Sequence, residues 1–246
     1  MWYFVHGTIN RLQRESKLVE IKRIIGGILQ ANCYIISPSQ RGDAKAATKE
    51  ETPCFIIDPG YDPGKIIKYI KSENLSPEGI ILTHHHVDHS GYADRVRKEL
   101  DCPIMIHRDD ADRYKEGADI FLEDGDVLAL CKGSSDCKGS SDSCAKDSDR
   151  GTVKLTVLHT PGHTKGGICL MSARDRIRFT GDTIFNVDLG RTDLDDGSYE
   201  EMVSSIMNVI DKWENDITIY PGHGDPATMK KVRKINLEFL EIVNGN

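Results

Sequence analysis

Metal-binding side chains are concentrated in one short run of the sequence. Within six residues this run contains four strong candidate ligands: His84, His86, Asp88 and His89. The apolar stretch Gly79-Ile80-Ile81-Leu82-Thr83 comes directly before it and has the pattern of a buried strand. The end of a strand holds side chains rigidly, as a metal site requires. Three later positions, each next to a glycine, extend the set: His163, Asp182 and His223.

Five histidines and two aspartates in this order predict a site for two divalent ions, with zinc expected first and iron or manganese as alternatives. Such a set leaves open coordination positions, which hydrolytic zinc needs. Two ions close together can share one water and lower its pKa from about 15.7 to about 7, so that hydroxide is available at neutral pH. We therefore expect Asp88 and Asp182 to be catalytic together with a metal-bound hydroxide. The ligands divide into one group of His84, His86 and His163 and a second group of Asp88, His89 and His223, with Asp182 as a bridge.

No motif for another chemistry competes with this interpretation. The chain has no Gly-x-Ser-x-Gly elbow, no His-Glu-x-x-His helix, no P-loop and no Gly-x-Gly-x-x-Gly. Three further histidines lack a ligand context and are expected to be ordinary surface or core residues: His6, His107 and His159. The seven cysteines are scattered and odd in number, so free thiols are expected. Three of them lie in apolar runs and are predicted to be core residues: Cys33, Cys54 and Cys169.

The composition is that of an ordinary globular protein. Of 246 residues, 38% are hydrophobic and 29% are charged, and the formal net charge is −7. No long stripe of lysine and arginine is present, which argues against a nucleic-acid partner. No apolar stretch reaches the length of a membrane span, and no secretory signal is readable at the beginning of the sequence. We therefore expect a cytoplasmic protein without a membrane partner.

The predicted elements place the ligands at strand ends. Strands are expected at 18–25, 33–37, 54–58, 80–83, 104–106, 153–158, 167–171, 176–180 and 217–220. Helices are expected at 63–74, 90–100, 108–115, 198–210 and 228–243. Ser198 and Glu201 have the spacing of a capping box. Two similar mixed halves predict an α/β (α+β) fold, with two sheets packed face to face and helices outside, in a single domain over residues 1–246.

Two segments are predicted to be surface insertions. Residues 39–53 are polar and lie between two predicted strands. Residues 131–151 contain Cys-Lys-Gly-Ser-Ser-Asp twice in succession, which cannot bury a core and predicts a mobile surface loop. A metal or redox clip formed by Cys131, Cys137 and Cys144 is the alternative, but their spacing fits no close zinc pattern. For residues 1–16 an extra edge strand and a disordered tail both remain open.

The ordered ligand set resembles that of the metallo-β-lactamase-fold hydrolases. The pattern His84-x-His86-x-Asp88-His89, followed by His163, Asp182 and His223, extends over most of the chain. The resemblance implies a four-layer αββα sandwich with the metals at one edge of the two sheets. It implies the same division of the ligands between two ions. It also implies that Asp58, at the end of its strand, orients a ligand histidine or the loop that carries it.

Within this superfamily the chain is similar to glyoxalase II, the hydroxyacylglutathione hydrolases, and in particular to the short, single-domain group. Matching segments include Leu29-Gln-Ala-Asn-Cys-Tyr34, Thr160-Pro-Gly-His-Thr164 and Pro221-Gly-His-Gly224. Larger glyoxalase II enzymes carry a C-terminal helical domain that helps to bind glutathione, whereas only 23 residues follow His223 here. The resemblance implies hydrolysis of a small-molecule thioester or a related acyl substrate, with S-lactoylglutathione as the reference. Lys165 and Arg191 are candidate anchors for a carboxylate on that substrate.

Three alternatives remain. A persulfide dioxygenase has the same fold and shares the segment Gly190-Arg-Thr-Asp193, and that resemblance would imply one iron at His84, His163 and Asp182. Against it, Pro221-Gly-His-Gly-Asp-Pro226 is more similar to the hydrolases. A lactonase or β-lactamase would use the same metal site on another acyl substrate. A non-catalytic module with structural metals is disfavoured, because structural zinc sites are usually closed and rich in cysteine.

Overall fold

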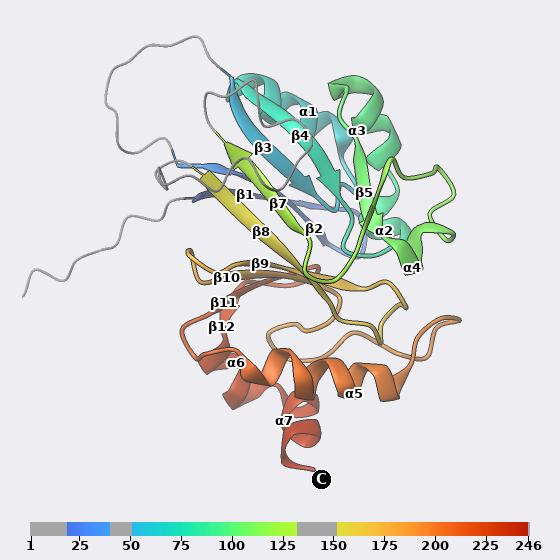
Figure 1. The fold of residues 1–246 in the computed structure, drawn as a ribbon, viewed down its shortest axis with the longest axis vertical. Helices are drawn as coiled ribbons and strands as arrows, with labels where there is room; N and C mark the ends of the chain where they lie inside the picture. The colour runs from blue at the N-terminus through green and yellow to red at the C-terminus, as the bar shows by residue number, and fades with distance from the viewer. Residues whose placement is uncertain (1–18, 40–50, 132–151, 246) are drawn as a thin grey trace, which may run out of the picture.

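The computed structural model describes residues 19–39, 51–131 and 152–245. Two six-stranded sheets pack face to face, and helices cover the outer face of each sheet (Figure 1). This is the four-layer αββα arrangement that the resemblance implies.

The first sheet has the strand order β1-β2-β3-β4-β5-β6. Its strands are β1 (Val19–Gly26), β2 (Ala31–Pro38), β3 (Thr52–Ile57), β4 (Leu75–Ile81), β5 (Ile104–His107) and β6 (Ile120–Leu122). The pairs from β1 to β3 are antiparallel, and the pairs from β3 to β6 are parallel. Every residue of β3 is buried, which explains its continuous apolar run. Because β3 and β4 are parallel, the loops that follow them leave the sheet at the same edge.

The second sheet has the strand order β12-β11-β10-β9-β8-β7. Its strands are β7 (Val127–Cys131), β8 (Thr152–His159), β9 (Ile168–Ser172), β10 (Ile177–Gly181), β11 (Thr218–Pro221) and β12 (Ala227–Thr228). Only β10 and β11 pair in parallel; the other neighbours are antiparallel. The loops after β10 and β11 therefore also leave their sheet at one edge.

The helices form the two outer layers (Figure 1). Over the first sheet lie α1 (Pro63–Ser72), α2 (Val87–Ser90), α3 (Ala93–Leu100) and α4 (Arg108–Ala111), and over the second lie α5 (Tyr199–Asn208), η1 (Ile210–Lys212), α6 (Met229–Ile235) and α7 (Leu237–Asn244). Three hydrophobic clusters fill the three interfaces between the four layers. The central cluster includes Tyr34, Phe55 and Phe179, and it joins the two sheets.

Several predicted boundaries were wrong. The expected helix 228–243 is divided into α6 and α7 at Asn236, whose Oδ1 accepts from the N–H of Phe239 and so begins a new helix. The expected helix 90–100 begins later, as α3 at Ala93, and the separate short helix α2 precedes it. Helix α4 ends at Ala111 rather than at Lys115. The short strands β6, β7 and β12 were not predicted. At Ser198 the capping prediction holds, because its Oγ accepts from the N–H of Glu201 at 3.2 Å.

The predicted bounds of the two insertions include residues that belong to strands. Thr52 and Pro53 already belong to β3, and Cys131 is the last residue of β7. The predictions for 1–16, 40–50 and 132–151, which include Cys137, Cys144 and His6, fall outside the described residues. Cys33, Cys54 and Cys169 are buried free thiols, as predicted. Among the described residues, no helix is both long enough and apolar enough to span a membrane.

Candidate metal centre

The predicted ligands meet where the two sheets join at one edge. The loop after β11 is attached to β2 of the other sheet: the N–H of Asn32 donates to the Gly222 carbonyl at 2.7 Å, and the Tyr34 hydroxyl donates to the Pro221 carbonyl at 2.8 Å. His223 therefore reaches the loops that follow β3 and β4, although it lies far from them in the sequence. All seven predicted ligands belong to groups that could hold a metal ion: His84, His86, Asp88, His89, His163, Asp182 and His223.

The first group, here called the first ligand trio, consists of His84, His86 and His163. Its ligand atoms lie within 4.8 Å of one another. Nδ1 of His86 faces Nε2 of His163 at 2.9 Å. Nδ1 of His163 lies 2.7 Å from the Arg191 carbonyl and donates to it, so in the neutral ring the lone pair is on Nε2. Nε2 of His84 is buried and has no hydrogen-bond partner among the described residues.

The second ligand trio consists of Asp88, His89 and His223. Nε2 of His223 lies 3.2 Å from Nε2 of His89 and 3.2 Å from Oδ2 of Asp88. Nδ1 of His223 donates to the Leu29 carbonyl at 2.9 Å, which leaves Nε2 for a metal. In both trios the candidate ligand atoms lie close together, and a backbone carbonyl holds the remote ring nitrogen of His163 and of His223. A divalent cation that displaces the protons of the second trio fits this arrangement.

Asp182 lies between the two trios. Its Oδ2 is 3.6 Å from Nε2 of His163 and 3.5 Å from Nε2 of His223, while its Oδ1 is 3.4 Å from Nε2 of His89. Oδ1 is buried and has no hydrogen-bond partner among the described residues. A Cβ atom at Gly222 would lie 2.1 Å from this oxygen, so the position requires a glycine. The carboxylate can therefore contact an ion in either trio.

Asp58 supports one histidine of each trio: His89 directly and His84 through Thr83. Its Oδ2 accepts from Nδ1 of His89 at 3.0 Å and from the Thr83 hydroxyl at 2.6 Å, and its Oδ1 accepts from the Thr83 N–H at 2.7 Å. The Thr83 oxygen in turn lies 3.1 Å from Nδ1 of His84. These contacts are those expected of a residue that holds ligand histidines in place.

The titration behaviour of the two trios differs. Burial, reinforced by His163, lowers the pKa of His86 to about 4, and burial with His89 and His163 lowers that of His84 well below its usual value. Burial also acts to lower the pKa of His89, but Asp182 and Asp58 outweigh it and raise the pKa to about 9.

In His223, Asp88 and Asp182, too, neighbouring charges and hydrogen bonds outweigh the effect of burial on the pKa. Against the effect of burial, hydrogen bonds to Asp182 and Asp88 raise the pKa of His223 to about 10. Burial would raise the pKa of Asp88, yet its hydrogen bond with His223 brings it down to about 2. Burial would also raise the pKa of Asp182, but His89 and His223 hold the pKa of that carboxyl below its ordinary value.

The two predicted substrate anchors are exposed. The Arg191 guanidinium donates to Asp193 through Nε at 2.7 Å and Nη2 at 2.8 Å, and its backbone carbonyl, not its side chain, touches the site through His163. The Lys165 carbonyl accepts from Nε2 of His159 at 2.8 Å. A role of either charge in substrate binding stays a prediction.

Sequence reasoning missed the supporting groups of the site. Buried Asp110 accepts hydrogen bonds from the loops of His84–His86 and His163, and the Leu29 and Arg191 carbonyls each hold a ligand histidine. In the sequence, Asp110 and its exposed neighbour Asp109 both come shortly after a predicted strand, and no pattern distinguishes the buried aspartate from the exposed one.

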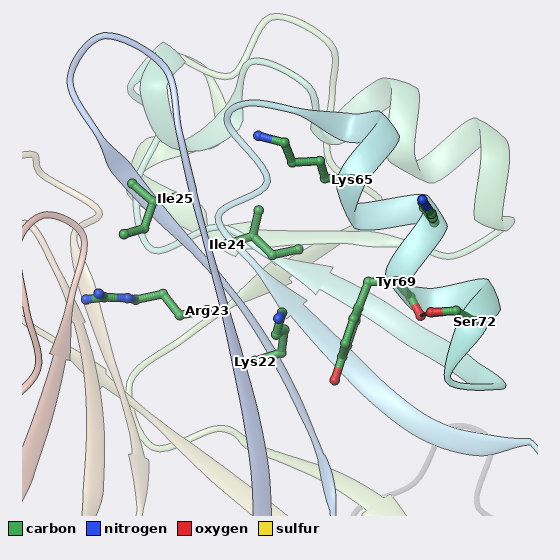
Figure 2. A pocket seen from close by; sticks show the side chains of 8 residues that line it. Lys22, Arg23, Ile24, Ile25, Lys65, Tyr69 and Ser72 are labelled. Carbon is green, nitrogen blue, oxygen red and sulfur yellow. Dashed lines mark hydrogen bonds between the residues drawn. The ribbon is translucent and has the colours of Figure 1, made fainter.

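Two features lie outside this centre. His107 and His159 stack at 4.0 Å between ring centroids beside Asp109. A groove of about 400 Å³ lies between β1 and α1 and is lined by basic and apolar side chains. Figure 2 shows Lys22 beside Tyr69 in this groove, whereas Arg23 points away from α1; its guanidinium reaches Asp225 at 2.9 Å. No residue of the groove belongs to either trio.

Comparison with known proteins identifies the family. The family model for the metallo-beta-lactamase superfamily matches residues 26–223, which include all the candidate ligands. The chain belongs to the metallo-beta-lactamase superfamily, and the fold and the ligand cluster agree with this.

Individual relatives give a more detailed view. The chain is 31% identical to the probable metallo-hydrolase YqgX of Bacillus subtilis, over 82% of this chain and 89% of that protein. It is 28% identical to the hydroxyacylglutathione hydrolase GloC of Haemophilus influenzae, over 84% of this chain and 92% of that protein. The structure is similar to that of the B3 metallo-beta-lactamase BLEG-1, with a TM-score of 0.70 and 26% identity over 88% of this chain and 98% of the other. The superfamily of metallo-hydrolases is therefore established for this chain.

Proposed function

We propose that this chain is a metal-dependent thioester hydrolase of the glyoxalase II type. The observation that carries the proposal is the pair of ligand trios that share Asp182, in which His84, His89, His163 and His223 present Nε2 towards the cluster. The name of the GloC relative and the motifs around His163 and His223 favour a thioester over other acyl substrates. The four described free cysteines are all buried, so none is offered as a nucleophile.

We assign one divalent ion to the first trio and one to the second, with Asp182 between them. Bound there, the ions would supply Lewis acidity for the substrate carbonyl and lower the pKa of a coordinated water to about 7. Zinc suits the mixed nitrogen and oxygen ligands, and iron or manganese would also be accepted.

The residues of the chain would orient the reactants. Asp88 is the more exposed of the two catalytic aspartates, with 17% of its side chain accessible against 10% for Asp182. Asp88 is thus placed to hold and orient the attacking water, while Asp182 fixes the separation of the trios. The leaving thiolate needs little protonation, because a thiol has a pKa near 8.5.

The test is a substrate panel with the zinc-loaded protein. Release of free thiol from S-lactoylglutathione would be compared with hydrolysis of an aryl ester, a lactone and a β-lactam, and oxygen uptake would be followed with glutathione persulfide and the iron-loaded protein. We expect kcat/KM for the thioester to exceed that for each other substrate. A preference for the lactone or the β-lactam would replace the proposed substrate class.

The dioxygenase alternative accounts for fewer of the observed contacts. A single iron at His84, His163 and Asp182 would leave Asp88, His89 and His223 assembled without a ligand role. Stoichiometric oxygen uptake with one iron per chain would nevertheless overturn the hydrolase proposal.

A further inference from the structure

Asp110 is a carboxylate with no exposed side-chain surface, and it lies outside the predicted ligand set. It belongs to α4 and contacts two loops. Ligand loop A comprises residues 82–86, between β4 and α2, and carries His84 and His86. Ligand loop B comprises residues 160–167, between β8 and β9, and carries His163. Together the two loops supply the whole first ligand trio.

Asp110 binds each loop at a position adjacent to a candidate ligand. Its Oδ2 accepts from the backbone N–H of His85 at 2.9 Å, and His85 lies between the two ligands of loop A. The same oxygen accepts from the Thr164 hydroxyl at 2.9 Å, directly after His163. Its Oδ1 accepts from the backbone N–H of Gly166 at 2.6 Å. One carboxylate therefore links the backbones of both loops.

The packing around this carboxylate is tight. A Cβ atom at Gly166 would lie 2.5 Å from the backbone nitrogen of Asp110 and 2.7 Å from its Oδ1, so loop B can approach α4 only with a glycine there. A backbone hydrogen bond of 3.0 Å from Ile168, the first residue of β9 and directly after loop B, to the Thr83 carbonyl of loop A adds a second connection. These contacts limit how far the loops that carry His86 and His163 can separate.

We propose that Asp110 is a positioning residue that sets the spacing of the first ligand trio and thereby the affinity of that trio for a divalent ion. The inference rests on the metal-dependent function proposed above. Metal–nitrogen bonds of about 2.0–2.1 Å tolerate little change in ligand spacing, so loops that can separate bind the ion more weakly. The second trio makes no hydrogen bond with Asp110 in the described structure, and Asp58 orients its His89 instead.

Asp110→Asn tests this role, with Asp109→Asn as a matched control. The amide has one acceptor oxygen, so the N–H groups of His85 and Gly166 can no longer both be satisfied. Asp109 precedes Asp110 in the same helix, and 52% of its side chain is exposed. Stepwise Zn²⁺ affinities of the metal-free chains would be measured by competition with a chromophoric chelator, and the Co²⁺ absorption spectrum would report the ligand geometry.

We expect Asp110→Asn to weaken the binding of one of the two ions by about 10- to 100-fold and to change its Co²⁺ spectrum. The other ion should bind as in the wild type, and Asp109→Asn should change neither affinity. Unchanged affinities for both ions in Asp110→Asn would overturn the proposal, and so would an equal loss for both, because that would indicate a general loss of structure.

A milder variant decides the question if Asp110→Asn does not fold. Thr164→Val keeps the shape of the side chain but removes the hydroxyl donor, and it should weaken the same single ion, whereas Thr164→Ser should restore wild-type binding. Unchanged binding in Thr164→Val would then overturn the positioning role. If the wild-type chain itself binds no zinc, the proposed function fails instead, and the two failures are thereby distinguished.

Discussion

The two ligand trios share Asp182 but differ in charge. The first contains only imidazoles, and burial and mutual repulsion lower the pKa values of His84 and His86. The second contains Asp88, and the surrounding carboxylates raise the pKa values of His89 and His223. At neutral pH His84 and His86 are therefore ready to bind a cation, whereas His89 and His223 of the metal-free second trio hold protons that an incoming ion must displace.

The trios also differ in what holds them. Asp58 bonds directly to a ligand ring, His89, and through Thr83 supports His84. Asp110 bonds to loop backbones and to Thr164, and touches no ligand ring of the first trio. One buried aspartate thus sets ring orientation, and the other sets loop spacing.

The largest effect is expected for Asp182→Ala, because this residue contacts both trios. Losing an interaction of several kcal/mol with the transition state corresponds to a loss of about 1,000-fold or more in thioester hydrolysis. Metal content should fall for both ions while circular dichroism shows a folded chain. Asp195→Ala, at an exposed aspartate that also follows β10 in the sequence, is the control and should keep its activity. Full activity in Asp182→Ala would contradict the mechanism.

His86→Ala and His223→Ala should separate the trios. Each variant should retain close to one zinc per chain by elemental analysis, because the opposite trio stays intact, and each should lose most hydrolytic activity. A variant that loses both ions would show that the trios bind metal only together. Retention of two ions by His223→Ala would remove this residue from the proposed ligand set.

The pH dependence of the metal-free chain should reveal the opposite charges of the trios. The folded-state pKa values of His89 and His223, about 9 and about 10, lie above the unfolded value of about 6.5. Their contribution to stability is therefore present below pH 6.5 and is lost as the pH rises through 9 to 10. The pKa of His86, about 4, lies below the unfolded value, so its contribution is present above pH 6.5 and is lost as the pH falls through 4.

Urea unfolding at a series of pH values measures this. His223→Asn should flatten the alkaline loss of stability, and His86→Asn should reduce the acid loss. If His223→Asn leaves the alkaline limb unchanged, the charge difference between the trios does not act as described.

The smallest effect is expected at the two exposed cations. If Lys165 or Arg191 attracts a substrate carboxylate, its replacement by alanine should raise KM by about 1.4- to fivefold at unchanged kcat, since exposed ion pairs contribute about 0.2–1 kcal/mol. High salt should reduce the difference. An unchanged KM in both variants would leave these residues as ordinary surface charges.

The sequence predicted the ligands more completely than their supports. Each candidate ligand comes soon after a strand or a glycine turn, and residue type and spacing alone were enough to predict a set whose members the structure brings together. Asp110 could not be found in this way, because burial depends on how α4 packs against loops that are distant in the sequence. The contacts of the Leu29 and Arg191 carbonyls with His223 and His163 cannot be predicted from residue type, since every residue has a backbone carbonyl. Asn236 was hidden within a continuous helical pattern for the same reason: its role depends on contacts with the distant carbonyls of Phe185 and Asp188.

The most direct test of the account is a crystal structure of the zinc-loaded chain with anomalous scattering recorded at the zinc edge. We predict two peaks per chain separated by about 3.5–4 Å, one within the first trio and one within the second, with Asp182 between them. A single peak within the first trio, with His223 turned away from it in fully loaded and active protein, would contradict the two-ion centre.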